Sequence, residues 1–262
     1  MAKSEIAFND GAAYERMIGK WSQIVGNVFL EWLAAPRGLR WIDVGCGSGA
    51  FTQLIVDQSA PIEVDGIDPA EAQLAFARMR PAARIAKFHQ GSAMALPFDD
   101  ASFDAAVMAL VIFFVPDPAK GVAEMARVVR PGGLLAAYAW DVYGDGMPTA
   151  PIQVEMRELG VDLTLPPSVE ASRLEVLREL WAATGLVDIE TRVITVHRTF
   201  DDFEDFWTTT ILSSSMASTL APMTVSEIDG IKERVRTRMQ PDETGRIACS
   251  ARVNAIKGRV RD

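Results

Sequence analysis

A glycine-rich run and two acidic residues have the types and the spacing of a ligand-binding site. The run is GCGSG at residues 45–49, which follows a short apolar stretch and precedes residues at helical spacing. Glycine has no Cβ, so such a loop lets backbone N–H groups and a helix N-terminus approach a ligand closely. Asp43 lies two residues before the first glycine, and Asp68 closes the next apolar run. The pattern predicts a ligand site made by a glycine loop and two carboxylates.

The two acids narrow the class of ligand. The spacing Gly-x-Gly-x-x-Ala at 45–50 satisfies the degenerate dinucleotide fingerprint. However, Gly49 lies one place earlier than the third glycine of that fingerprint, and Asp43 would repel a phosphate. A carboxylate at Asp43 can instead reach an ammonium group, and one at Asp68 can accept hydrogen bonds from both ribose hydroxyls. These features favour a nucleoside that carries an amino acid, which is S-adenosylmethionine.

The elements that must position these residues alternate between strand and helix patterns. This alternation predicts an α/β fold, with a parallel sheet covered by helices on both faces. Ligands bind such sheets at the carboxyl ends of the strands, which is where the loop and the acids fall. The predicted strands span residues 39–44, 62–67, 84–89, 103–110 and 134–140.

Several segments fall outside this alternation. Residues 10–35 contain a predicted helix, and 141–170 is rich in Gly and Pro without a sustained period. A helix at 174–184 and strands at 187–196 and 247–256 complete a predicted single domain over 1–262.

We expect the helix at 10–35 and the insertions 141–170 and 200–240 to form a lid over an acceptor pocket. Core packing is the competing interpretation for the large apolar side chains assigned to that pocket, which are Phe113, Phe114, Trp140, Phe206, Trp207 and Met216.

The sequence resembles the class I S-adenosylmethionine-dependent methyltransferases, especially the small-molecule branch that includes quinone-biosynthesis C-methyltransferases. The resemblance implies a Rossmann-like, doubly wound, mostly parallel seven-stranded sheet with helical lid insertions. It also implies methyl transfer to a small molecule, with S-adenosylhomocysteine as product, but says little about the acceptor. We expect a small apolar or aromatic acceptor because of the large apolar side chains assigned to the pocket and because the acidic composition disfavours nucleic acid. The matching segments are IDVGCGSG (42–49), GID (66–68), GSAMALPF (91–98), SFDAAV (102–107) and RPGG (130–133).

The resemblance also implies roles for single residues. Asp43 and the glycine loop hold the methionine moiety, Asp68 holds the ribose, and the segment 14–21 folds over the cofactor. Ser92 stands where many relatives carry an acid, which leaves the backbone or the hydroxyl to accept the adenine amino group. The expected cofactor-binding residues are Asp43, Gly45, Cys46, Gly47, Gly49, Asp68, Pro69, Ser92, Ala93, Leu110, Tyr14 and Trp21.

Structural alternatives remain open for these side chains. Asp43 can cap backbone groups beneath the loop, and Asp68 can be a helix N-cap. Cys46 is interpreted as a small loop filler instead of a nucleophile, and His89 as structural. No catalytic residue is identified except His197, a weak candidate for a general base.

Composition limits the partners. The net charge is −9, and the basic residues within 231–262 are interpreted as a solvated helix face, so nucleic acid is not expected. The longest uncharged apolar run, at 105–115, is shorter than the roughly 20 residues of a membrane span, and no signal sequence is recognised. Cys46 and Cys249 lie far apart without metal-ligand spacing. We therefore expect a cytoplasmic protein without a metal or a stable membrane anchor, whose oligomeric state stays open.

Two other functions use the same framework. One is an NAD-dependent oxidoreductase, and the other is a catalytically silent cofactor-binding partner protein. Binding of NAD without S-adenosylmethionine would favour the first, and a sealed acceptor pocket would favour the second.

Overall fold

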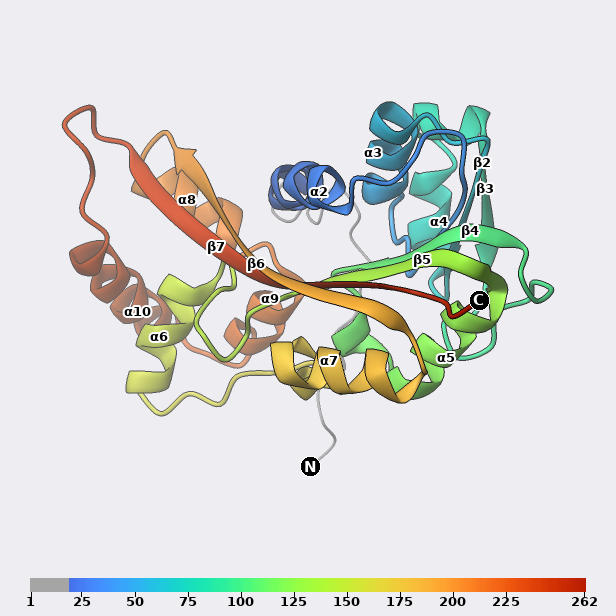
Figure 1. The fold of residues 1–262 in the computed structure, drawn as a ribbon. Coiled ribbons are helices and arrows are strands. Elements are labelled where there is room, and N and C mark those ends of the chain that lie inside the picture. The colour runs from blue at the N-terminus through green and yellow to red at the C-terminus, as the bar shows by residue number, and fades with distance from the viewer. Residues whose placement is uncertain (1–18) are drawn as a thin grey trace.

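The computed structural model describes residues 19–262, whose strands form one seven-stranded sheet (Figure 1). The five strands from β3 to β5 are parallel, whereas β7 runs antiparallel to both of its neighbours. This confirms the predicted mostly parallel, doubly wound sheet. In spatial order the strands are β3 (Ala86–Gln90), β2 (Glu63–Asp68), β1 (Arg40–Val44), β4 (Phe103–Ala109), β5 (Val129–Trp140), β7 (Ile247–Arg259) and β6 (Val187–Phe200).

Helices cover both faces of the sheet because its central strands are apolar on both sides. Trp41, Ile42 and Val44 on β1 are fully buried, as are the four consecutive residues 105–108 of β4. In Figure 1 helices α2, α3 and α4 lie on one face of the sheet, and α5 and α7 lie on the other. The helices are α2 (Lys20–Leu33), α3 (Ala50–Ser59), α4 (Glu71–Ala77), α5 (Pro118–Val128) and α7 (Leu174–Ala183), with short 3-10 turns η2 (Pro81–Arg84), η3 (Ile112–Phe114) and η4 (Val169–Ser172).

Strands β6 and β7 continue past the parallel strands as a long antiparallel pair, and a group of helices from the segment that connects them lies at the far end of this pair (Figure 1). We call α6 (Ala150–Glu158), α8 (Phe203–Thr210) and α10 (Val225–Arg238) the distal lobe; α9 (Ser214–Leu220) connects α8 to α10. A capping box of Thr224 and Glu227 begins α10. Ion pairs join the three helices: Arg234 on α10 reaches Glu155 on α6, and Lys232 reaches Glu204 on α8.

Several elements differ from the sequence predictions, including β7, which ends at Arg259 instead of residue 256. The segment 141–170, which was expected to lack a regular element, contains helix α6. Its apolar pattern is weak, and contacts with α10 stabilise it. Strand β5 starts at Val129 instead of residue 134, because Val129 pairs with Phe103 ahead of a register shift, after which Leu134 pairs with Ala105. Strand β6 continues to Phe200 instead of ending at 196, since β7 pairs with it throughout.

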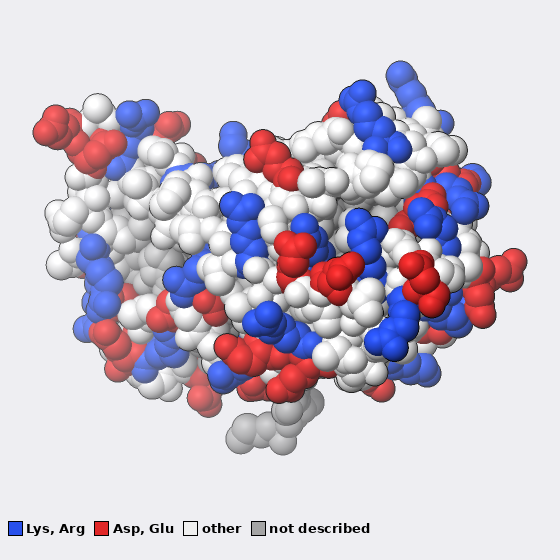
Figure 2. Space-filling view, in the orientation of Figure 1, with Lys and Arg blue, Asp and Glu red and all other residues white. Residues whose placement is uncertain are grey.

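The surface carries charges of both signs. Figure 2 shows Lys and Arg interspersed with Asp and Glu over the face in view, without a large region of one sign. Among residues 19–262, no helix has the length and apolar character that crossing a bilayer requires.

Candidate functional site

The glycine loop joins β1 to α3 at the carboxyl edge of the sheet. The amides of Gly45 and Cys46 both donate to the carbonyl of Ile67 at the end of β2, over 2.7 and 3.1 Å. Gly45 has a φ of +77°, and a Cβ there would lie 2.4 Å from a methyl carbon of Val111. Only glycine therefore fits, and the loop lies directly against the chain that leaves β4.

Asp43 is a fully buried acid beneath this loop. Its Oδ2 accepts a hydrogen bond of 2.6 Å from the Thr52 hydroxyl on α3, whereas Oδ1 has no partner among the described residues. Burial raises the pKa of Asp43 to about 7, and the nearby Asp68 adds to the increase, while the Thr52 hydrogen bond opposes it. A buried acceptor without a partner is costly, so this oxygen fits a ligand donor better than it fits a purely structural cap.

Asp68 ties the loop to the next helix. Its Oδ2 accepts from the amide of Gly47 at 2.9 Å, and its Oδ1 accepts from the amide of Ala70 at 2.8 Å. The prediction that Asp68 is a helix N-cap is wrong, because the N-cap of α4 is Ala70 and no side-chain hydrogen bond caps that helix. Burial raises the pKa of Asp68, and the two backbone hydrogen bonds oppose that increase.

Cys46 is buried in the loop beside both acids. Burial and the negative charges of Asp43 and Asp68 raise the pKa of its thiol well above the usual value. The thiolate is the reactive form of cysteine, so the protonated Cys46 supports the interpretation as a loop filler.

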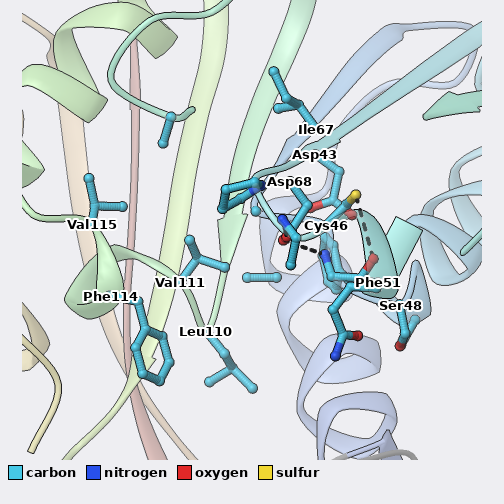
Figure 3. A pocket seen from close by; sticks show the side chains of 18 of the residues that line it. Asp43, Cys46, Ser48, Phe51, Ile67, Asp68, Leu110, Val111, Phe114 and Val115 are labelled. Atoms are coloured by element: carbon cyan, nitrogen blue, oxygen red, sulfur yellow. Dashed lines mark hydrogen bonds between the residues drawn. The ribbon is translucent and has the colours of Figure 1, made fainter. Parts of the chain in front are cut away.

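A cavity of about 220 Å³ opens above these groups, far larger than the roughly 30 Å³ of one water molecule. Figure 3 shows Asp43, Cys46 and Ser48 on one side of it, with Val111, Phe114 and Val115 on the other. Asp43 and Asp68 are the only charged side chains among the described residues that line it. The lining residues are Ser22, Asp43, Gly45, Cys46, Gly47, Ser48, Ala50, Phe51, Ile67, Asp68, Pro69, Ala70, Gln73, Ser92, Ala93, Ala109, Leu110, Val111, Phe114, Val115, Pro116 and Tyr138.

Most of the residues predicted to bind the cofactor meet at this cavity. Gly49 does not line it; a Cβ on Gly49 would face Ala77 on α4 at 3.0 Å. Trp21 is packed in the core of the protein, and its neighbour Ser22 lines the cavity instead. Tyr14 lies outside the described residues. The predicted residues that line the cavity are Asp43, Gly45, Cys46, Gly47, Asp68, Pro69, Ser92, Ala93 and Leu110.

The two histidines have no place in the cavity. His197 was a candidate base because it was expected to follow a strand, but it is an exposed residue within the edge strand β6. It does not line the cavity, and the structure gives it no role there. His89 hydrogen-bonds to Asp65 through Nε2 at 2.6 Å and packs edge-on against Phe98, which agrees with a structural role.

The expected aromatic acceptor pocket is not formed as predicted. Of its six side chains only Phe114 lines the cavity, and the other five are buried in the protein core. None of the described lining residues comes from 141–170 or 200–240. These insertions pack against each other in the distal lobe, because α6 finds its partner in α10. The wall facing the loop comes instead from residues 110–116.

Sequence reasoning missed several of the lining residues. Tyr138 lies at the floor, fully buried, with its ring 4.6 Å from that of Phe29 and 5.8 Å from that of Phe51. A tyrosine within the otherwise aliphatic run LLAAYA is a signal that could have been used, since a buried hydroxyl needs a partner. Ser22 gave a similar signal as a polar residue on the buried face of α2.

The backbone at Leu110 adopts an unusual conformation. Its φ is +62°, in the left-handed region that favours glycine, and its amide donates to the carbonyl of Tyr138. A bulky residue there costs about 1–2 kcal/mol. The turn directs Val111 onto Gly45 and leads the chain into η3 along the cavity wall.

Strand β7 runs antiparallel next to the edge of the sheet, a glycine loop follows β1, and acids lie at the carboxyl ends of β1 and β2. This arrangement is typical of α/β proteins that bind a nucleoside at that edge of the sheet. The profile of the methyltransferase domain family matches residues 42–137. An uncharacterised protein of Mycobacterium tuberculosis is 30% identical over 196 residues, covering 71% of this chain and 70% of its own length. A demethylmenaquinone methyltransferase of Staphylococcus aureus is 33% identical over 136 residues, covering 51% of this chain and 54% of its own.

Solved structures share the fold. A phosphoethanolamine N-methyltransferase of Haemonchus contortus in complex with S-adenosylmethionine superimposes with a TM-score of 0.57 at 19% identity, over 95% of this chain and 56% of its own. The chain belongs to the class I S-adenosylmethionine-dependent methyltransferases. It is therefore an enzyme that transfers the methyl group of S-adenosylmethionine and releases S-adenosylhomocysteine.

Proposed function

We propose that this enzyme methylates a small, apolar or aromatic acceptor held between the glycine loop and the wall made by residues 110–116. The observation that supports this is the division of the cavity. Both charged side chains that line it, Asp43 and Asp68, lie on the loop side, whereas Val111, Phe114 and Val115 are apolar and face them.

The polar side fits the cofactor. In our proposal Asp43 Oδ1 accepts a hydrogen bond from the ammonium group of the methionine moiety, which gives that buried oxygen a partner. Asp68 lies at the ribose, Pro69 and Ala93 lie against the adenine, and Leu110 lies near the sulfonium. When bound, S-adenosylmethionine supplies an activated methyl group that leaves sulfur by in-line displacement.

The apolar side disfavours charged acceptors. None of the described lining residues is Lys or Arg, so a phosphorylated acceptor finds no cationic partner there. The name of the Staphylococcus aureus relative indicates a demethylmenaquinone substrate, an apolar ring compound of the kind that this wall suits. We therefore propose an acceptor of that chemistry for this chain.

The proposed mechanism rests on positioning. Phe114, Val111 and Leu110 exclude water from the space where acceptor and methyl group meet, which fixes the distance and angle of attack. A general base is required only if the acceptor must lose a proton during the transfer. We propose an acceptor whose nucleophilic atom is electron-rich without carrying a charge, such as the ring carbon of a hydroxylated aromatic compound. This carbon takes the methyl group as the bond from methyl to sulfur breaks, and its own proton is then lost to solvent as the ring regains aromaticity.

The test is transfer of a radiolabelled methyl group to a panel of acceptors. We expect label in hydroxylated aromatic compounds and quinols, with none in phosphoethanolamine. Phe114→Ala should raise the acceptor KM about tenfold, because about 1.4 kcal/mol of apolar contact is lost, while the Kd for S-adenosylmethionine stays the same. Phe114→Leu is the matched control and should restore most of the affinity. Preferential methylation of phosphoethanolamine would contradict the proposal.

We also propose that the chain acts as one domain, in which residues 37–140 form the cofactor-binding half. Support comes from the continuous sheet, because β5 pairs with β4 of that half and with β7 of the remainder. Limited proteolysis should then yield no stable fragment ending near residue 140.

A further inference from the structure

The conformation of the glycine loop depends on contacts with the residues around it. Gly45, Gly47 and Gly49 all have positive φ, at +77°, +51° and +75°. Glycine loses more backbone entropy on ordering than any other residue, so the conformation must be fixed by contacts from outside the loop. The amides that face a ligand depend on those contacts.

Two residues that flank helix α4 contact the loop, one before the helix and one after it. Before the helix, Asp68 accepts from the amide of Gly47 at 2.9 Å. After it, Arg80 donates through Nε to the carbonyl oxygen of Ser48 at 2.6 Å and through Nη2 to the Ser48 hydroxyl at 3.4 Å. Gly47 is therefore held by a carboxylate, and the adjacent Ser48 by a guanidinium, from the two sides of the same helix.

The stem of Arg80 packs on the loop as well. A Cβ on Gly49 would lie 3.4 Å from Cδ of Arg80, so the side chain runs along the loop before its guanidinium reaches Ser48. Ser48 is 3% exposed, and a hydrogen bond from a charged donor to a carbonyl shielded from water in this way is stronger than one between neutral groups. Arg80 does not itself line the cavity.

We propose that Arg80 is a positioning residue for cofactor binding. It holds the Ser48 carbonyl so that the amides of 45–49 stay in the arrangement that receives S-adenosylmethionine. Without it the loop populates other conformations, and the apparent Kd rises as the competent fraction falls. This inference rests on the proposed cofactor contacts of the loop.

A purely architectural role for Arg80 would be to attach α4 and η2 to α3. That attachment has another contributor, because Gln53 on α3 accepts from the amide of Ala82 at 2.7 Å. Gln53→Ala therefore weakens the attachment and leaves the contact to Ser48 intact, which separates the two roles.

The experiment compares Arg80→Met, Arg80→Lys and Gln53→Ala with a matched control, Arg78→Met. Arg78 follows the same helix but donates to Glu71 and to the carbonyl of Phe88 instead of to the loop. The measurements are the Kd for S-adenosylmethionine by calorimetry, hydrogen exchange of the amides of 45–49 without ligand, and Tm.

Arg80→Met is expected to raise the Kd about tenfold and to speed exchange in the loop, because about 1.4 kcal/mol of restraint is lost. Arg80→Lys should recover part of both, since it can donate to the carbonyl but not through a second nitrogen. Arg78→Met and Gln53→Ala should keep the wild-type Kd, whatever their Tm.

Wild-type affinity and exchange in Arg80→Met would overturn the proposal. So would a loss of affinity matched by Gln53→Ala, which would indicate an architectural role. If Arg80→Met does not fold, Arg80→Lys carries the test with the same measurements. If the wild-type protein binds no S-adenosylmethionine, the proposed cofactor contacts fail, while the exchange experiment still reports whether Arg80 holds the loop.

Discussion

The cofactor end of the sheet and the distal lobe bury acids in opposite ways. Asp43 is fully buried with one oxygen unpartnered among the described residues, and no lining residue among them is cationic. Glu155 in the distal lobe is almost as buried, with its side chain 2% exposed, yet Arg234 and Arg238 reach its two oxygens at 2.7 and 2.5 Å. An unpaired buried carboxylate is costly. The contrast indicates that one region is shaped for a ligand and the other for holding helices together.

Neutralising Asp43 should give the largest effect. Asp43→Asn keeps the shape of the side chain but loses the charge, so the Kd for S-adenosylmethionine should rise about 30- to 100-fold, as expected for a charged hydrogen bond. The Tm at pH 8 should not fall, because a buried charge is removed. Asp65→Asn is the matched control on β2, since Asp65 is also buried but pairs with His89. Equal losses in both variants would refute the assignment.

The unpaired burial of Asp43 should also make the affinity for S-adenosylmethionine depend on pH. The pKa of Asp43 is about 7 when folded, above the ordinary 3.8, so the acid is neutral in much of the free enzyme below pH 7. Affinity for S-adenosylmethionine should therefore fall as pH decreases below 7, by about tenfold per unit. The stability of the free protein should change in the opposite direction, because burial disfavours the ionised form of Asp43. The favourable contribution of Asp43 to the free energy of unfolding is fully present below pH 3.8 and is lost as the pH rises through about 7.

Calorimetric titration and urea unfolding between pH 5 and 8.5 measure these two trends. Asp43→Asn should abolish both. An affinity that does not change over this range in the wild-type enzyme would contradict the ionisation of Asp43 on binding.

Breaking the paired acid of the distal lobe should have a smaller effect, on stability alone. Glu155→Gln should lower the free energy of unfolding by about 1–2 kcal/mol, because its arginine partners are half exposed and regain solvation. The Kd for S-adenosylmethionine should not change. Glu158→Gln removes an exposed carboxylate that contacts the same arginines and should be closer to neutral. A large loss of affinity in Glu155→Gln would show that the two regions are coupled.

The smallest effect is expected at Cys46. Because burial and two acids raise the pKa of its thiol, the native protein should resist an aromatic disulfide reagent at pH 8, and both cysteines should react after unfolding. Cys46→Ala should change the Kd for S-adenosylmethionine by less than about threefold, since the side chain offers only contact area. Rapid labelling of the native protein would show a thiolate in the loop.

The sequence predicted well the parts of the site whose geometry is local. A strand, a glycine turn and a helix follow from a few adjacent residues, and parallel strands bring Asp43 and Asp68 to the same edge whatever else the chain does. The acceptor side was predicted less well. Phe206 and Trp207 have the same helical spacing whether they face a cavity or a core, and only the packing of α8 against β6 and α10 decides.

His197 illustrates the same limit. Its role depended on where β6 ends, and the end of an edge strand is set by its partner β7, far along the chain. Helix α6 was missed for a related reason, because contacts with α10 hold a segment whose own pattern is weak.

The left-handed backbone conformation of Leu110 affects how this position can be substituted. Glycine would relieve a steric cost of about 1–2 kcal/mol at this left-handed position, but Leu110 is buried, and loss of a buried leucine side chain costs about 2–5 kcal/mol. The packing of the isobutyl group therefore outweighs the strained backbone. Shorter side chains at this position should widen the cavity and lower the stability, so a variant that admits bulkier molecules needs a compensating substitution elsewhere.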